Sequence, residues 1–273
     1  MGKISDALER HNKEREIKTE MLFPNKAPDV PVRDNVLQTQ KEVIRQMDYD
    51  PKLVMMTAPD SYEAENFKLL RAQIMFAKDR KRPRTIMVTS SMPGDGKTFV
   101  AANLAVSIAS GIDEHVLLVD CDLRRPDIHK MFGISRSDGL HECLAGKRQL
   151  SDLLIRTKIN KLSLLTAGHP PHNPSELLAS GAMVSFLEEI RDRYDDRIIV
   201  LDTAPSQVLA EANVLSNFVE GIIFIIRSEK TPREMIRKAI DGLGRDKILG
   251  FVFNGYSQEW KSYGKYYKKY YNR

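Results

Sequence analysis

Short runs of apolar residues recur between positions 84 and 254 and predict the strands of a sheet. The runs are nearly continuous rather than alternating, as expected for strands that are buried on both faces. Stretches with helical periodicity lie between them, so the chain predicts an α/β fold with a mostly parallel, doubly wound sheet. The predicted strands are 84–90, 115–120, 161–167, 197–202, 221–227 and 247–254, and the predicted helices are 63–78, 98–110, 175–194, 207–217 and 231–243.

The segments that flank this alternation have a different pattern. Residues 3–22 predict a polar helix with a weak apolar stripe, which is either a solvated helix or a docking helix. Residues 24–60 contain five prolines and predict an extended arm with little regular structure. We therefore expect three parts: an N-terminal helix and arm (1–60), a folded domain (61–255) and a tail (256–273).

Composition limits the class of protein. A chain of 273 residues with 42% hydrophobic residues is long enough for one large domain, and a net charge of +5 does not indicate a nucleic-acid binder. The apolar runs are far shorter than the ~20 residues that a membrane span requires. Two cysteines and the histidines His129, His169 and His172 fit no metal-ligand spacing, and we expect these histidines on the surface or in loops. A cytoplasmic protein without disulfides is expected.

A glycine-containing loop follows the first predicted strand. SMPGDGKT, residues 91–98, matches the phosphate-loop pattern G-x-x-x-x-G-K-[ST] except that Ser91 replaces the first glycine. In this pattern backbone N–H groups around Gly94, Asp95 and Gly96 surround phosphate oxygens, while Lys97 reaches the terminal phosphates and Thr98 suits Mg²⁺. The loop lies between a strand and a helix, which favours nucleotide binding over the alternative of a tight structural turn.

Aspartates follow two of the other predicted strands. Asp120 and Asp122 come at the end of VLLVDCD, and Asp202 ends RIIVLD. A single aspartate at such a place is often a helix cap, but the carboxyl ends of parallel strands meet at the edge that carries the loop. Three carboxylates together there predict metal binding and proton transfer beside a nucleotide.

Several stretches carry a family resemblance. DCDLRRP (120–126) followed by HKMFG, GLHECLAG (139–146), AGHPPHNPSELLAS (167–180) and LDTAP (201–205) resemble the bacterial tyrosine kinase (BY-kinase) family of capsular and exopolysaccharide biosynthesis. The resemblance spans residues 58–273. It implies a P-loop NTPase fold with deviant Walker motifs, and a protein-tyrosine kinase that uses ATP and Mg²⁺.

The resemblance also implies roles for individual residues. Lys97, Asp120 and Asp122 would be catalytic, with Asp120 as the base for an incoming phenol. Thr98, Asp122 and Asp202 would hold Mg²⁺. Asn254 lies where related folds contact the adenine base, although an asparagine that ends a strand is also a common turn residue.

The end of the chain is rich in tyrosine and lysine. The resemblance implies that this cluster is autophosphorylated in trans by an adjacent subunit, and that the kinase regulates polymerisation or export of an exopolysaccharide. The tyrosines concerned are Tyr256, Tyr263, Tyr266, Tyr267, Tyr270 and Tyr271.

Assembly and partners are implied in the same way. Glu65, Lys68 and Arg71 occupy the positions of the family motif Glu-x-x-Arg-x-x-Arg, which packs subunits into a ring. Lysine cannot reproduce a bidentate arginine contact, so an ordinary charged helix face is the alternative. The family further implies a separate membrane chain-length regulator as activator, a tyrosine phosphatase, and a peripheral place at the inner membrane through that partner.

Two other functions remain open. Chromosome-partition and division-positioning ATPases share the fold and the strand-end motifs, but they carry a second lysine where this loop has Met92. The third possibility is a scaffold that binds nucleotide without catalysis, which the presence of all the expected carboxylates disfavours.

Overall fold

The structure is a computed structural model that describes residues 47–193, 196–206 and 210–256. The predicted helix at 3–22 and the tyrosines after Tyr256 lie outside these ranges. No helix within them is long and apolar enough to cross a membrane.

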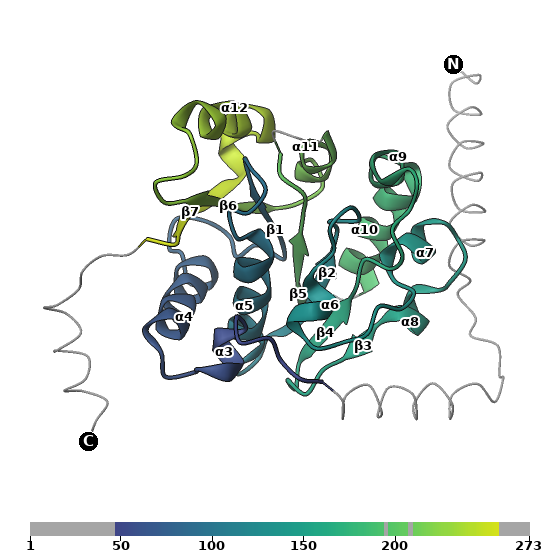
Figure 1. Cartoon of the computed structure of the whole chain (residues 1–273), viewed down its shortest axis with the longest axis horizontal. Helices are drawn as coiled ribbons and strands as arrows, with labels where there is room; N and C mark the ends of the chain where they lie inside the picture. Colours follow the sequence, from purple (N-terminus) through teal and green to yellow (C-terminus); the bar gives the residue numbers. More distant parts are fainter. Residues whose placement is uncertain (1–46, 194–195, 207–209, 257–273) are drawn as a thin grey trace, which may run out of the picture.

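A mostly parallel sheet organises the described part of the chain (Figure 1). There it has seven strands in the order β3-β4-β2-β5-β1-β6-β7, and neighbouring strands are parallel except for β3 and β4. The predicted strands and their alternation with helices are therefore confirmed, and the short edge strand β3 is an addition. The strands are β1 (Thr85–Ser90), β2 (His115–Asp120), β3 (Ile155–Arg156), β4 (Leu162–Leu165), β5 (Arg197–Asp202), β6 (Gly221–Arg227) and β7 (Ile248–Asn254).

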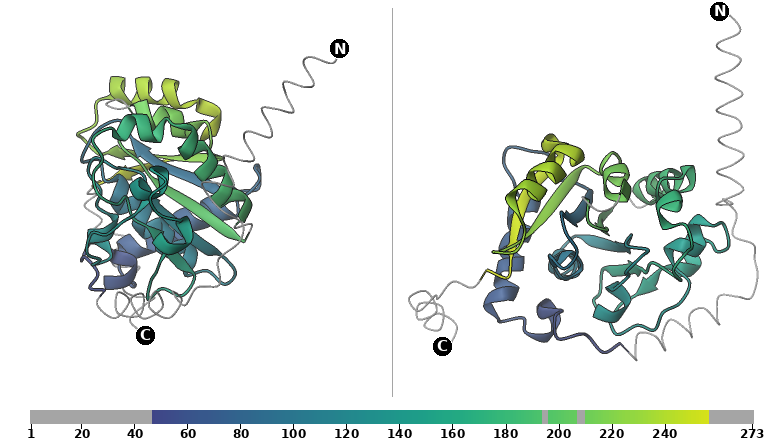
Figure 2. Two further views of the ribbon diagram at one scale, coloured as in Figure 1. Left: turned by 90° about the vertical axis from the view of Figure 1, so that its right-hand side faces the viewer. Right: turned by 45° about the horizontal axis from the view of Figure 1, so that its top comes forward.

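Helices cover both faces of this sheet (Figures 1 and 2). Alternate residues of the central strands point into opposite cores: Val88 packs with α3, α4 and α5, whereas Met87 packs with α9, α10 and α12. This two-sided burial explains the nearly continuous apolar runs. The helices are α3 (Val54–Thr57), α4 (Tyr62–Met75), α5 (Lys97–Ala109), α6 (Ile128–Met131), α7 (Leu140–Leu144), α8 (Leu150–Leu153), α9 (Pro174–Leu178), α10 (Gly181–Arg193), α11 (Ala210–Ser216) and α12 (Arg233–Leu243), followed by the 3₁₀ turn η1 (Arg245–Lys247).

Two predicted elements differ from the structure. The helix expected at 175–194 is interrupted, because α9 ends at Leu178 and α10 begins at Gly181. The end of the expected arm is ordered and packed, since Leu53 and Met55 are buried in the core beneath α5. Asn103 of α5 holds it there by donating to the carbonyl of Lys52 and accepting from the N–H of Met55. The packed unit thus begins before residue 61.

Candidate nucleotide and phosphoryl-transfer site

The phosphate loop leaves β1 and runs into α5. Gly94 and Gly96 have positive φ angles of 82° and 100°, a conformation that glycine adopts without steric cost. Gly96 directly precedes Lys97, the first residue of α5, so the positive end of the helix dipole faces the loop. The strand–loop–helix context that the motif requires is present.

Asp95 of this loop points into the protein. Its carboxylate accepts hydrogen bonds from the backbone N–H of Met92 (3.1 Å) and from the hydroxyl of Thr231 (3.0 Å). Its carbonyl accepts a hydrogen bond from the side-chain amide of Asn254 (2.8 Å). Thr231 was not anticipated, because it is 136 residues away in the chain and belongs to no motif.

Asp120 and Asp202 end neighbouring strands and occupy paired positions in the β2–β5 register. Both side chains are fully buried. Among the described residues, no donor other than the nearby Thr98 hydroxyl is available to the Asp202 carboxylate oxygens. Burial raises the pKa of Asp202 to about 7, against the opposing effects of the Thr98 hydroxyl and the Lys97 ammonium. A buried carboxylate whose nearest donor is a threonine hydroxyl fits the oxygen ligands that Mg²⁺ prefers.

The two aspartates of the DCD stretch have different surroundings. The carboxylate of Asp120 accepts the backbone N–H groups of Asp122 and Ile128 at 3.2 and 3.1 Å. Burial and the charge of Asp202 raise the pKa of Asp120 well above its usual range. Asp122 is partly exposed and lines the cavity in front of the loop. Partial burial raises the pKa of Asp122, although the N–H of Arg125 and the charge of Lys97 oppose this rise. Asp122, unlike the fully buried Asp120, therefore lines the cavity.

The cavity in front of the loop has a volume of about 760 Å³. Its lining combines phosphate-loop residues with cationic side chains from elsewhere, which suits a polyanionic ligand. Lys52 and Asp50 contribute to it although they come from the segment predicted to be an extended arm. The lining includes Gly94, Lys97, Thr98, Arg124, Arg125 and Lys130.

Arg124 connects this cavity to two other segments. Its guanidinium donates to the buried carboxylate of Glu211 (3.2 Å) and to the hydroxyl of Ser175 (2.7 Å). Ser175 in turn donates to the same Glu211 oxygen. The DCDLRRP and NPSELL stretches are far apart in the sequence. At the cavity wall they are joined by hydrogen bonds that both make to Glu211 of α11.

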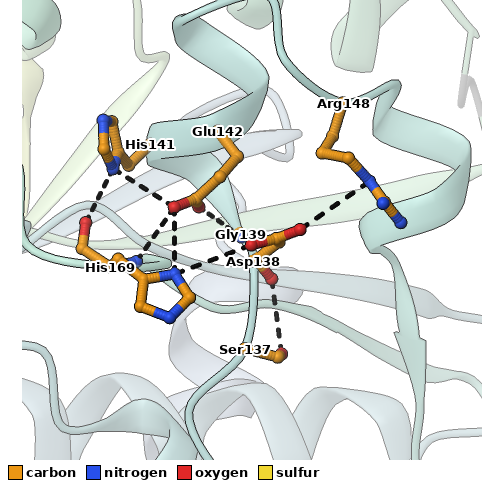
Figure 3. A network of polar contacts seen from close by, with 7 residues as sticks. All are labelled: Ser137, Asp138, Gly139, His141, Glu142, Arg148 and His169. Carbon is orange, nitrogen blue, oxygen red and sulfur yellow. Dashed lines mark hydrogen bonds and ion pairs between the residues drawn. The ribbon is translucent and has the colours of Figure 1, made fainter.

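Glu142 and His169 join two further motif stretches (Figure 3). The Glu142 carboxylate accepts the N–H of Gly139 (2.7 Å) and lies 3.1 Å from Nδ1 of His169, while Asp138 is 3.6 Å from that nitrogen. Burial raises the pKa of Glu142, but hydrogen bonds from Gly139 and other donors outweigh it and leave this pKa below its usual value. The position of His169 in the sequence does not predict an acidic neighbour. In the structure, the potential ligand atoms of Asp138, Glu142 and His169 lie within 4.8 Å of one another.

The remaining predicted residues are distributed over the surface and outside the described ranges. Glu65 and Lys68 pair with each other along α4 (3.1 Å), and Arg71 donates to the carbonyl of Ser107 on α5 (2.7 Å). Their role in oligomerisation stays a prediction. Tyr256 is 61% exposed just after β7. His129, expected at the surface, is instead buried in α6.

The chain is similar to known proteins over most of its length. Residues 83–231 match the AAA domain family. The chain is 36% identical to the tyrosine-protein kinase YwqD of Bacillus subtilis (strain 168) over 205 residues, which is 74% of this chain and 85% of that protein. The chimeric protein CapA2B2 is 30% identical, with a TM-score of 0.70, over 80% of this chain and all of that one. The kinase domain of the Escherichia coli tyrosine kinase ETK is 30% identical, with a TM-score of 0.68, over 77% of this chain and 83% of that one.

A more distant likeness concerns the fold alone. The septum site-determining protein MinD of Pyrococcus horikoshii is 23% identical, with a TM-score of 0.50, over 68% of this chain and 76% of that one. The likeness at 36% identity covers most of both chains. This chain belongs to the bacterial tyrosine-protein kinases.

Proposed function

We propose that this protein is an ATP- and Mg²⁺-dependent tyrosine autokinase that phosphorylates its own C-terminal tyrosines in trans. One observation carries the proposal: a glycine-rich phosphate loop, its lysine and three aspartates converge on one edge of the sheet, beside an open cavity. The physiological output that we infer is regulation of exopolysaccharide polymerisation or export.

The phosphate loop supplies the binding part of this reaction. Backbone N–H groups around Gly94 and Gly96, with the N-terminus of α5, bind the triphosphate, and Lys97 neutralises its terminal groups. Thr98, Asp122 and Asp202 would hold Mg²⁺, which neutralises charge that develops on the phosphates during transfer. Lys97 is itself mostly buried although it lines the cavity, so water screens its attraction for phosphate less than it would for a surface lysine.

The phenol must lose a proton as it attacks, because its usual pKa is ~10. The family resemblance gives this role to Asp120. In the structure both Asp120 oxygens accept backbone N–H groups and the side chain is fully buried, so the groups that cover it must move before a phenol can reach it. Asp122 already lines the cavity and is a second candidate. Single-turnover rates of Asp120→Asn and Asp122→Asn at saturating Mg·ATP distinguish them, since the base variant loses its chemical step while the other chiefly loses affinity.

Phosphotyrosine blotting after incubation with ATP and Mg²⁺ tests the main claim. Wild-type protein should become labelled, and Lys97→Met should lose the label because the terminal phosphates lose their cation. An unlabelled wild type, or equal labelling of Lys97→Met, would contradict the kinase. ATP hydrolysis without any phosphotyrosine would instead favour a partition-type ATPase.

The route of transfer needs a separate experiment. A Lys97→Met protein with an intact tail is mixed with an active protein truncated after residue 255. Labelling of the inactive protein requires transfer between molecules, whereas an inactive protein that stays unlabelled while wild type is labelled indicates transfer within one chain.

Partners of the kinase follow from the resemblance. We propose a separate membrane chain-length regulator as activator, a tyrosine phosphatase as antagonist, and localisation in the cytoplasm next to the inner membrane through the activator. Co-expression with the regulator encoded nearest to the gene should increase autophosphorylation. A Lys97→Met strain should change exopolysaccharide yield or length if the regulatory role is correct, and an unaltered product would contradict it.

A further inference from the structure

Two side chains at the β6–β7 edge of the sheet donate hydrogen bonds to Asp95 of the phosphate loop. Thr231 follows β6 and donates its hydroxyl to Oδ1 of Asp95 at 3.0 Å. Asn254 ends β7 and donates its amide to the Asp95 carbonyl at 2.8 Å. Asp95 is only 3% exposed, and its two donors Thr231 and Asn254 are half-buried, so water competes less for these bonds than it would at the surface.

Space is restricted on the side of the loop where Gly96 meets Asn254. A Cβ atom on Gly96 would lie 1.9 Å from Nδ2 of Asn254. The Asn254 amide therefore rests directly against the glycine whose φ of 100° turns the chain into α5. A side chain in this place limits the loop sterically as well as by its hydrogen bond.

The two holding residues are themselves fixed. Thr231 accepts the backbone N–H of Arg227 at 2.9 Å, and Asn254 pairs with Arg227 in the β6–β7 register. The Asn254 carbonyl also accepts the N–H of Ser228 at 2.9 Å. Thr231 and Asn254 thus belong to one rigid corner of the sheet, which contacts the loop through Asp95.

Holding the loop matters because its glycines are costly to order. Glycine loses more backbone freedom on fixation than any other residue, and fixing one residue costs roughly 1–2 kcal/mol. A loop that is already fixed does not lose this freedom when phosphate binds, so its affinity is higher. The Asp95 carboxylate further orders the loop by accepting the Met92 N–H.

We propose that Thr231 and Asn254 are positioning residues that hold the phosphate loop in its binding conformation through Asp95. Asn254 acts on the loop and does not read the adenine base. The inference rests on one part of the proposed function, that the loop binds a triphosphate, and it is independent of phosphoryl transfer to tyrosine.

Binding of three ligands to the full chain tests the proposal: Mg·ATP, Mg·GTP and Mg·tripolyphosphate, which has no base. Thr231→Val and Asn254→Ala should each weaken all three by a similar factor of about five to ten, as expected for the loss of one hydrogen bond. Thr231→Ser keeps the hydroxyl and should bind within about twofold of wild type. Thr157→Val removes a hydroxyl that bonds to Ile159 and Leu162 far from the loop, and it should bind normally.

Several outcomes would overturn the inference. Loss of ATP affinity in Asn254→Ala with unchanged tripolyphosphate binding would assign Asn254 to the base. Wild-type affinity in Thr231→Val would show that the loop does not need the Thr231 hydroxyl. Because valine is nearly isosteric with threonine, this variant keeps the test valid even if Asn254→Ala does not fold. Equal weakening in Thr157→Val would indicate general destabilisation. Wild-type protein that binds none of the ligands would exclude the phosphate site itself, whereas normal binding without phosphotyrosine would contradict only the kinase.

Discussion

Burial determines the chemistry of the aspartates in this site. Asp202 and Asp120 are ordinary acids in sequence, but they end adjacent strands inside the fold, where two negative charges repel each other and water is absent. Lys97 and Thr98 lie close enough to oppose the rise in the pKa of Asp202. The site is consequently strained electrostatically when no cation is bound.

The metal-free protein should therefore be less stable at higher pH. The pKa of Asp202 is about 7 in the folded protein, against an ordinary value of 3.8 that applies to the unfolded chain. Between these two pH values the folded protein holds a proton that the unfolded chain has released. Stability falls as pH rises through this window. In EDTA, Asp202→Asn should melt about 2–4 °C above wild type at pH 8, equivalent to about 1 kcal/mol. The difference should shrink toward pH 5.

A matched control is Asp60→Asn, which changes an exposed carboxyl. Its melting temperature should follow wild type across the same pH range. A difference between Asp202→Asn and wild type that stays constant with pH would contradict the raised pKa of Asp202.

At the scale of elements, the start of α7 is hydrogen-bonded to the segment that directly follows β4. Leu140 and His141 donate their N–H groups to the carbonyls of Thr166 and Ala167. The Gly139 N–H is capped by Glu142. Satisfying these N–H groups at the beginning of a short helix requires close approach of two backbones, and Gly139 permits it.

Gly139→Ala should destabilise the protein. Its Cβ would lie 2.2 Å from the carbonyl oxygen of Thr166, a backbone atom that cannot move without displacing the β4 connection. Overpacking of this kind costs about 1–3 kcal/mol, or about 2–10 °C in melting temperature. Thermal melting monitored by circular dichroism checks the prediction.

Gly181→Ala is the matched control, because no atom lies within 4 Å of its added Cβ at the start of α10. It should leave the melting temperature unchanged or raise it slightly, through better helix propensity. Equal effects of the two substitutions would show that the contact at Gly139 is not tight.

For the whole molecule, we propose that the charge of the tail links phosphorylation to assembly. Residues 256–273 carry Lys261, Lys265, Lys268, Lys269 and Arg273 against Glu259, so five positive charges minus one negative charge leave +4. Each phosphate adds about −1.5 to −2 at neutral pH. Two or three phosphorylations would cancel the charge of the tail, and we propose that the basic tail docks on a neighbouring subunit and is released when phosphorylated.

Replacing all six tail tyrosines by glutamate should loosen the oligomer in sedimentation velocity, because the same tail then carries a negative charge. Replacing them by glutamine removes the phenols but adds no charge, and should leave assembly closer to wild type. A glutamate variant that sediments like the parent protein would contradict the electrostatic switch and leave the kinase proposal intact.

The sequence alone was sufficient for the sheet, the phosphate loop and the family. Apolar runs predict strands because burial on both faces leaves a local pattern, and the glycines of 94–96 predict the loop because its backbone angles demand them. Lys97 and the aspartates at the ends of strands are likewise predicted from their immediate neighbours in the sequence. Each of these features depends on residues that are neighbours in the chain.

Tertiary structure alone decided which distant groups meet. Asp120 and Asp122 are two residues apart, yet only packing determines that the first is covered and the second faces the cavity. The contact of Thr231 with Asp95 and that of His169 with Glu142 join segments 136 and 27 residues apart. Such contacts leave no periodic trace in the sequence, because a hydrogen bond depends on where two chain segments lie in space and not on their spacing along the chain.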